Sequence, residues 1–296
     1  MTQAPAGTRA DVWLTDPAVC RQAPLRRAYE ALLSGPEQVQ HRRFFFEVDR
    51  DRYLLTRALV RCVLGEYTGA PPETLQFKTN AWGKPALQAS AATARLAFNV
   101  SHTTGLVALV VTEGQPVGLD IEDTRRTAPL GVAHRFFSAH ERAALAALPA
   151  RLQPRRFWEL WTLKESYVKA LGMGLHHALD SFGFDLASAD HGIAFSSPAG
   201  LPAGRWWLGS WQASPHHLLA LCLEAEDAQG PLLRVRRITP LVDRSDCTLT
   251  ALRATRARCA EAADGAATAA PVPARLSRRA CLPQATRPAP PAEPMT

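Results

Sequence analysis

Residues 96–123, LAFNVSHTTGLVALVVTEGQPVGLDIED, contain two or three β-rich runs that Gly and Pro signals separate, as in a meander. Before them, residues 51–69 repeat apolar side chains at helical spacing until Gly65 and Gly69 interrupt the pattern. After Val117 the order strand, helix, helix, strands returns loosely. Helical and strand patterns therefore occur in both parts of the chain, which indicates an α+β fold.

This repeated order divides the chain into segments. We expect an N-terminal α+β half over residues 1–116 and a C-terminal α+β half over residues 117–240, each within the usual size of a domain. In the second half, Ser138 followed by Glu141 forms a capping box, which predicts a helix start. A cleft between two similar halves is a natural place for a ligand.

The remaining segment, residues 241–296, contains no Phe, Tyr or Trp and is rich in Ala, Pro and Arg. Such a composition buries too little apolar surface to offset the entropy of ordering. We therefore expect a disordered C-terminal tail.

Composition limits the function classes. Outside the last segment the chain holds 26 basic and 22 acidic residues, and this net charge of +4 is mild. No basic stripe or nucleic-acid-binding module stands out, so an anionic small molecule or an acidic protein suits the chain at least as well as nucleic acid. The six cysteines form no CxxC pair and read as reduced thiols. We find no signal peptide and no apolar run long enough to span a membrane, so we expect a cytoplasmic protein.

One short strand pattern, VGLDIED, suggests a metal site. Val117, Leu119 and Ile121 alternate with polar positions, so a strand would bury them and present Asp120 and Glu122 on its other face, about 7 Å apart. Two neighbouring carboxylates repel each other unless a cation such as Mg²⁺ lies between them. A strand end with solvated acids would look the same, so the motif alone is weak.

The helix expected over residues 156–175, RFWELWTLKESYVKALGMGL, strengthens this interpretation. Glu165 lies on the same stripe as Trp158 and Trp161, where a carboxylate is costly unless it is paired, metal-bound or protonated. A salt bridge to Lys169 is the simpler explanation, but an exposed pair contributes only about 0.3–0.5 kcal/mol. Lys164 lies about 100° round the helix, from where it could reach a ligand at the edge of the cleft.

Together, VGLDIED and FWELWTLKESYVKALGMGL resemble the two signature motifs of the 4′-phosphopantetheinyl transferases, and FNVSHT and WGKPAL follow that family's usual order upstream. The resemblance runs from about Val12 to Pro240. The chain is similar to the larger Sfp type, in which two similar α+β halves pack as a pseudo-dimer and act as a monomer. It implies transfer of the 4′-phosphopantetheine arm of coenzyme A to a serine hydroxyl of an apo acyl carrier or peptidyl carrier protein. The other product would be adenosine 3′,5′-bisphosphate.

The resemblance also implies a role for individual residues. Asp120, Glu122 and Glu165 would hold Mg²⁺, or Mn²⁺, against the pyrophosphate of coenzyme A, and Glu165 is in addition the candidate general base. The residues that would contact coenzyme A are Arg52, Lys84, Ser101, His102, Lys164 and Lys169, with Lys169 placed on the pyrophosphate and counted as catalytic.

The segment upstream of Arg52 departs from the family pattern. Some relatives carry lysines where this chain has Gln38 and Gln40. Binding of the 3′-phosphate could then depend on His41, Arg42 or Arg43, and the sequence does not decide among these three.

Two other classes of function stay open from the sequence. A non-catalytic carrier-protein or coenzyme A binding module would account for the altered upstream segment. A nucleic-acid-binding protein would account for the basic pI and the arginines of the tail, although we expect no nucleic acid partner and no membrane partner.

Overall fold

The computed structural model describes residues 8–88, 95–174, 178–188, 190–196, 206–225 and 230–255. These residues all lie within one compact unit, Met1–Arg258. The part of the expected tail beyond residue 255 lies outside the described residues.

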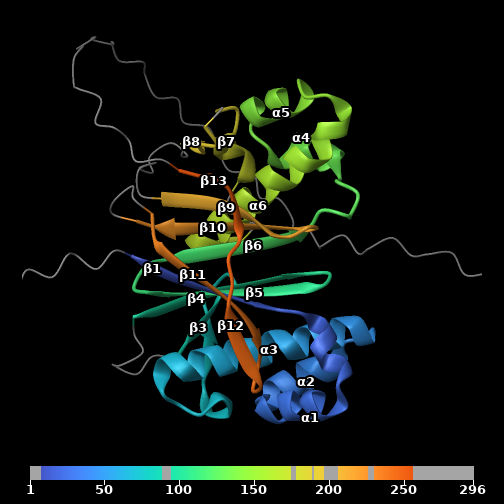
Figure 1. Ribbon diagram of the computed structural model, residues 1–296, viewed down its shortest axis with the longest axis vertical. Coiled ribbons are helices and arrows are strands. Elements are labelled where there is room, and N and C mark those ends of the chain that lie inside the picture. Colours follow the sequence, from blue (N-terminus) through green and yellow to red (C-terminus); the bar gives the residue numbers. More distant parts are fainter. Residues whose placement is uncertain are drawn as a thin grey trace, which may run out of the picture. The chain divides into compact units, whose positions relative to one another are not determined.

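The strands form two main sheets, which occupy the middle of the ribbon in Figure 1. The five-stranded sheet has the order β12 (Asp243–Asp246), β11 (Leu232–Thr239), β1 (Arg9–Thr15), β5 (Leu106–Glu113) and β4 (Leu96–Thr103). The four-stranded sheet has the order β13 (Thr250–Ala254), β9 (Trp206–Ser214), β10 (His217–Glu224) and β6 (Val117–Asp123). Among these neighbouring strands, only β1 and β11 run parallel.

Two short hairpins complete the strands of the described residues. They are β2 (Phe77–Thr79) with β3 (Pro85–Leu87), and β7 (Gly183–Asp185) with β8 (Ala194–Ser196).

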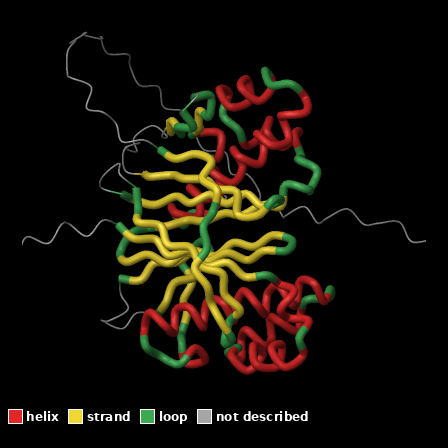
Figure 2. Tube along the Cα trace, viewed as in Figure 1, coloured by secondary structure: helices red, strands yellow, loops and turns green. Residues whose placement is uncertain are grey.

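The helices form two separate layers on the outer faces of the two sheets (Figures 1 and 2). The first layer holds α1 (Ala23–Leu32), α2 (Gly35–Arg43) and α3 (Glu47–Thr68), and the second holds α4 (Ala133–Phe136), α5 (Ala139–Ala146) and α6 (Gln153–Leu171). Short 3₁₀ turns lie at Pro17–Arg21, Pro72–Thr74, Leu130–Val132, Ala150–Leu152 and Leu179–Ser181. No helix in the described part of the chain is long and apolar enough to cross a membrane.

Three apolar clusters follow from this layering. One joins α1–α3 to the outer face of the five-stranded sheet, and a second joins α4–α6 to the outer face of the four-stranded sheet. The third lies between the sheets, where Val12 and Val110 face Leu119 and Leu221. The central strands β1, β5, β6, β9 and β10 therefore bury both faces, which explains why β5 is apolar almost throughout.

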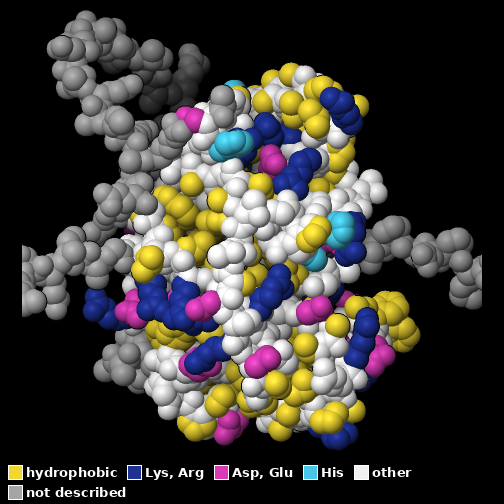
Figure 3. All heavy atoms as spheres, viewed as in Figure 1, with side chains coloured by type: hydrophobic (Ala, Val, Ile, Leu, Met, Phe, Trp, Pro, Cys, Tyr) yellow, Lys and Arg dark blue, Asp and Glu magenta, His cyan; other side chains and the backbone are white. Residues whose placement is uncertain are grey.

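The structure confirms the α+β class and the capping box, in which the Ser138 side chain accepts from the Glu141 amide. The meander is correct for β4 and β5, which form an antiparallel hairpin. It is wrong for β6, which pairs with β10 in the other sheet. Space-filling shows hydrophobic side chains gathered at one edge of the α1–α3 layer, next to charged side chains (Figure 3).

Two expected boundaries are wrong in the same way. β11 belongs to the stretch assigned to the C-terminal half, yet it pairs with β1 in the sheet of the N-terminal half. β12 and β13 belong to the expected tail of residues 241–296, yet both are strands at sheet edges. An edge strand is held mainly by backbone hydrogen bonds, so it forms without the aromatic side chains that the tail lacks.

Candidate active site

Alternate side chains of β4 cross from one sheet to the other. The backbone amide of residue 119, on β6, donates to Asn99 Oδ1 at 2.8 Å. Ser101 Oγ donates to Asp120 Oδ1, also on β6, at 2.9 Å. The backbone amide of residue 123, on β6 as well, donates to Thr103 Oγ1 at 3.3 Å. The three side chains share one face of the strand because successive residues point to opposite faces. They fix β6, and with it Asp120, against β4.

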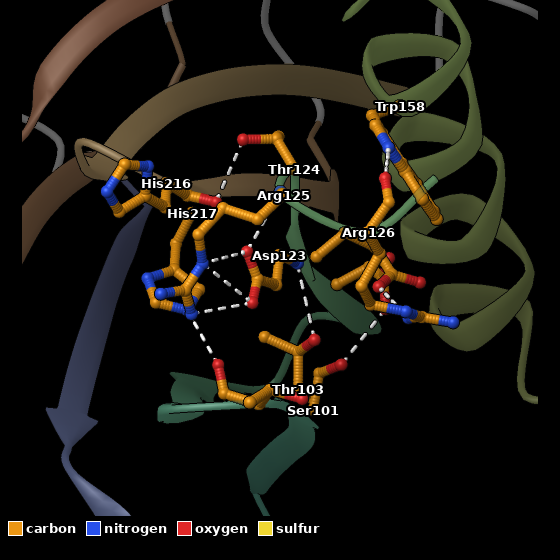
Figure 4. Close-up of polar contacts among 12 residues, drawn as sticks. Ser101, Thr103, Asp123, Thr124, Arg125, Arg126, Trp158, His216 and His217 are labelled. Atoms are coloured by element: carbon orange, nitrogen blue, oxygen red, sulfur yellow. Dashed lines mark hydrogen bonds and ion pairs between the residues drawn. The ribbon is translucent and has the colours of Figure 1, made fainter. Parts of the chain in front are cut away.

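A second polar group locks the same junction at the end of β6 (Figure 4). Arg125 Nη2 donates to Asp123 Oδ2 at 2.8 Å, and this charged neighbour lowers the pKa of Asp123. His217 Nε2 lies 2.8 Å from the carbonyl oxygen of Thr104, and its Nδ1 lies 2.6 Å from Ser214 Oγ. The β4–β5 turn is thereby tied to the start of β10.

Gly118 lets α6 lie directly on β6. A methyl group on this residue would lie 2.8 Å from the carbonyl carbon of Lys169, and closer still to the backbone of Ser166. α6 ends at Gly172, which adopts a left-handed φ of 69°. The close approach explains why residues near the end of α6 reach Asp120 on the strand.

Asp120 is the centre of the site. Its residue is only 4% exposed. Its Oδ1 accepts from Lys169 Nζ at 2.6 Å, and Lys169 Nζ also donates to Ser101 Oγ at 2.9 Å. Its Oδ2 is buried and has no hydrogen-bond partner. A buried carboxylate oxygen without a partner is costly, so this atom is ready to accept a cation or a donor.

Glu122 and Glu165 bring further negative charge to Asp120. Burial, and then the Asp120 carboxylate, raise the pKa of Glu165 from its ordinary 4.5 to about 7. The same two causes raise the pKa of Glu122 to about 7, although Arg126 Nη1 lies 3.0 Å from Glu122 Oε2. The protein therefore places three carboxylates within electrostatic reach of one another and holds part of their charge as bound protons.

Lys169 pairs with Asp120 rather than with Glu165. The simple explanation of an i,i+4 salt bridge within the helix is therefore wrong. Lys169 instead joins the helix to the strand.

Arg52 and Asp120 both lie within electrostatic reach of His102. Desolvation by the surrounding protein is the largest cause that lowers the pKa of His102, and the charges of Arg52 and Lys169 lower it further. The charge of Asp120 has a weaker, opposite effect. Arg52 also forms an ion pair with Asp49. His102 is exposed, and its neutral ring lies near two cations. This position is suited to bind an anion.

Lys164 does not reach a ligand, contrary to the sequence prediction. Its side chain is 0% exposed and pairs with Glu141, whose side chain is also 0% exposed, at 2.8 Å. Its ammonium also donates to the carbonyl oxygens of Leu179 and Phe182, at 2.8 Å each. All three donors are thus used inside the protein, because Lys164 turns into the α4–α6 layer rather than toward β6.

Lys84 is also committed to the protein itself. Its Nζ donates to the carbonyl oxygens of Val117 at 3.0 Å and Lys169 at 2.6 Å, with a longer bond of 3.3 Å to Ala170. Burial lowers the pKa of Lys84 to about 8. The residue joins the β2–β3 hairpin to β6 and α6, which does not fit the predicted contact with coenzyme A.

The open question about the upstream segment receives a partial answer. His41 is 8% exposed and stacks on Tyr53, with 6.4 Å between ring centroids. It lines a cavity of about 700 Å³ with Arg26, Arg42 and Arg50. Because His41 is buried in the α1–α3 layer, it is poorly placed to bind the 3′-phosphate.

Known proteins match both parts of the chain. Residues 23–114 match the family model described as the N-terminal part of 4′-phosphopantetheinyl transferase, and residues 116–222 match the 4′-phosphopantetheinyl transferase superfamily model. The 4′-phosphopantetheinyl transferase Sfp of Bacillus subtilis is 30% identical over 199 residues, which cover 67% of this chain and 85% of Sfp. The chain belongs to this superfamily.

Two further relatives match a shorter stretch. The 4′-phosphopantetheinyl transferase HetI of Nostoc sp. is 36% identical over 49% of this chain and 62% of its own length. The 4′-phosphopantetheinyl transferase psf-1 of Bacillus pumilus is 37% identical over 47% of this chain and 58% of its own length. The chain thus spans about three fifths of the length of these two proteins.

The carboxylates of this superfamily member fit a hard divalent cation in their chemistry. Carboxylate oxygens are the ligands that Mg²⁺ prefers, and Asp120 Oδ2 is a buried oxygen without a partner. Burial, and then the Asp120 carboxylate, raise the pKa values of Glu122 and Glu165, so both carboxyl groups lie enclosed by the protein and within electrostatic reach of Asp120. Among the described residues, however, no three His, Cys, Asp or Glu side chains stand ready as a metal-binding group.

Sequence reasoning missed Asn99 and Thr103, although both lie in the quoted motif FNVSHT. Their alternation with Phe98 and Val100 is a strand signal, and three polar side chains on one face of a strand indicate a polar partner there. The residues they would meet on β6 lie in the other sheet, which the sequence does not reveal.

Proposed function

We propose that this chain transfers the 4′-phosphopantetheine arm of coenzyme A to a serine hydroxyl of an apo acyl carrier or peptidyl carrier protein. The observation that carries the proposal is the junction of β4, β6 and α6. There Asp120 meets Lys169 at 2.6 Å, with Glu122 and Glu165 in electrostatic reach, in a chain of this superfamily. We propose that the chain acts as a monomer, since one copy supplies every residue of this junction.

In the proposed complex, cations of the site bind the two phosphate-bearing parts of coenzyme A. Arg52 and His102 would face the 3′-phosphate, and Lys169 would exchange its contact with Asp120 for one with the pyrophosphate. An ammonium acts there as a point charge toward phosphate. Ser101, which accepts from Lys169 and donates to Asp120, would orient both groups.

Asp120, Glu122 and Glu165 would hold Mg²⁺ or Mn²⁺. When bound, the cation would stabilise charge on the phosphoryl oxygens and on the leaving group. Its binding would favour the ionised forms of Glu122 and Glu165, whose pKa values are raised in its absence.

The reaction itself is a displacement at phosphorus. The serine oxygen forms a bond to the phosphorus that bears the pantetheine arm, while the bond from that phosphorus to the bridging oxygen breaks and adenosine 3′,5′-bisphosphate leaves. The serine proton passes to Glu165 directly or through a water molecule. If Glu165 instead only positions the cation, the proton passes to solvent.

The test is to incubate the pure protein with coenzyme A, Mg²⁺ and a panel of apo carrier proteins, and to weigh the carriers for the phosphopantetheine adduct. Asp120→Ala and Glu165→Gln should keep the fold and lower the rate by at least about 10². Asp246→Asn is a matched control, since its side chain is 66% exposed at the edge strand β12. Normal adduct formation by Asp120→Ala would reject the proposal.

A non-catalytic binding module is the alternative. It is motivated by the altered upstream segment, in which this chain carries Gln38 and Gln40. Coenzyme A binding by calorimetry, together with no adduct on any carrier of the panel, would support it.

The four cysteines among the described residues, Cys20, Cys62, Cys222 and Cys247, are free thiols. This fits the reducing cytoplasm in which we propose that the protein acts.

A further inference from the structure

An unusual share of the exposed apolar surface lies at the α2–α3 junction. Val39 is 47% exposed, Phe45 88%, Phe46 63% and Val48 66%. They are four of the ten large apolar side chains that are exposed in the described part of the chain, and they fall within ten consecutive residues. We call these four residues the Phe45 patch. Single exposed apolar residues are ordinary, but a cluster of this kind marks an interaction site.

The two phenylalanines form a compact pair. Their ring centroids are 5.1 Å apart and the rings are perpendicular, while the preceding Phe44 turns inward and packs on Tyr53 at 5.2 Å. Arg50 Nη2 donates to the carbonyl oxygen of Phe44 at 2.9 Å, which fixes the turn. The aromatic pair is therefore held outward by a fixed backbone, as in the anchors of protein interfaces.

Positive charge borders the patch. Arg42 and Arg43 end α2, both are exposed, and neither has an ion-pair partner among the described residues. By contrast, the exposed acid of the same junction, Glu47, pairs with Arg26 at 2.9 Å. The unpaired charge beside the patch is thus positive, and a complementary surface would be apolar and acidic.

One residue of the patch lines a cavity together with residues that lie close in sequence to Arg52 and His102. Val48 lines a cavity of about 600 Å³ together with Asp51, Thr104 and Gly105. Asp51 precedes Arg52 on α3, and Thr104 follows two residues after His102 on the β4–β5 turn. A protein bound on the patch would therefore extend over this cavity toward His102 and Asp120.

We propose that the Phe45 patch, with Arg42 and Arg43, is the docking surface for the protein substrate, which meets it with an acidic and apolar face. The inference rests on the proposed function, because that function requires a protein whose serine is brought to Asp120. A bare membrane surface would also suit aromatic and basic side chains, but the position of the patch beside the cavity favours the substrate of the same site.

The experiment compares two paired substitutions with controls in the steady-state modification of an apo carrier protein. Phe45→Ser with Phe46→Ser should raise the KM for the carrier about tenfold or more. The kcat at saturating carrier and the KM for coenzyme A should stay unchanged. Leu152→Ser, at a residue 45% exposed in the other helical layer, should change none of these values.

A charge reversal tests the basic border separately. Arg42→Glu with Arg43→Glu should raise the KM for the carrier by a factor that falls as salt is added, because salt screens exposed charges. Arg151→Glu, an exposed control in the other helical layer, should leave it unchanged.

Three results would overturn the docking surface. One is an unchanged carrier KM in Phe45→Ser with Phe46→Ser, and another is a rise in the KM for coenzyme A instead. The third is loss of self-association or of binding to phosphatidylserine vesicles while the carrier KM is kept, which would assign the patch to a second copy or to a membrane.

If the unaltered chain modifies no carrier, the proposed function fails but the surface can still be tested. Calorimetry would then measure carrier binding directly. Weaker binding to the Phe45→Ser and Phe46→Ser variant supports the surface, and equal binding or none to either protein overturns it.

Discussion

Replacing Lys164 by Met tests whether this lysine holds the fold or a ligand. Met keeps the length of the side chain but removes the ammonium, which leaves the buried Glu141 carboxylate without its cation. Glu141 would keep only the amides of Ser138 at 2.8 Å and Phe184 at 2.9 Å as donors. The carbonyl oxygens of Leu179 and Phe182 would lose their bonds to Lys164.

Removing one partner of a buried ion pair typically costs about 3–5 kcal/mol. Both side chains here are 0% exposed, so the upper part of that range applies. For a folded unit of this size, about 1 kcal/mol lowers the melting temperature by roughly 2–4 °C. We therefore expect Lys164→Met to lower the melting temperature by roughly 8–20 °C.

Thermal and urea unfolding at pH 7 would measure this loss, with Lys78→Met as control because Lys78 is exposed on β2. Adding Glu141→Gln should restore part of the stability, since the amide removes the buried charge and keeps an acceptor oxygen for one of the two backbone donors. A decrease in melting temperature of less than about 2 °C, combined with a raised KM for coenzyme A, would refute the structural role. It would indicate that Lys164 contacts the ligand instead.

Three further substitutions test other contacts of the site. Gly118→Ala should cost at least about 1–3 kcal/mol in urea unfolding, because the new methyl group meets the α6 backbone; Gly131→Ala, with open space around it, should not. In buffer with EDTA, the free energy of unfolding should fall as pH rises from about 5 to 8, because Glu165 holds a proton in the folded state up to a pKa of about 7 but in the unfolded state only to 4.5. Glu165→Gln should weaken this fall, and an unchanged slope would show that its pKa is ordinary. Lys84→Met should cost about 1–3 kcal/mol and leave the KM for coenzyme A within about twofold, whereas a large rise in KM would favour the ligand contact.

The acidic residues of the site could be predicted because their signals are local. Asp120 and Glu122 follow from the alternation of one strand, and Glu165 stands out because its own helix places it beside tryptophans. Lys164 shows the limit of such reasoning. The helical angle predicts on which side of the helix Lys164 lies. It does not predict that Glu141 and the turn at residues 179–182 lie on that side, because only the fold brings them there.

The sheet order shows the same limit over longer distances. No local pattern in Leu232–Thr239 indicates that this strand pairs with Arg9–Thr15 instead of with its sequence neighbours. The composition of the tail correctly indicates few buried side chains, yet β12 and β13 need only an open sheet edge. Exposure of Phe45 and Phe46 likewise depends on where Phe44 finds room to pack.

The parallel pairing of β1 with β11 has a consequence for synthesis. β1 leaves the ribosome first among the strands, but one of its two neighbours is among the last described strands to appear. Until then, one side of β1 offers unpaired amides and carbonyls to any other extended chain. A chain that leaves the ribosome before residue 232 is translated would keep that side of β1 unpaired permanently. The yield of soluble protein in a cell should therefore depend on how quickly translation reaches β11.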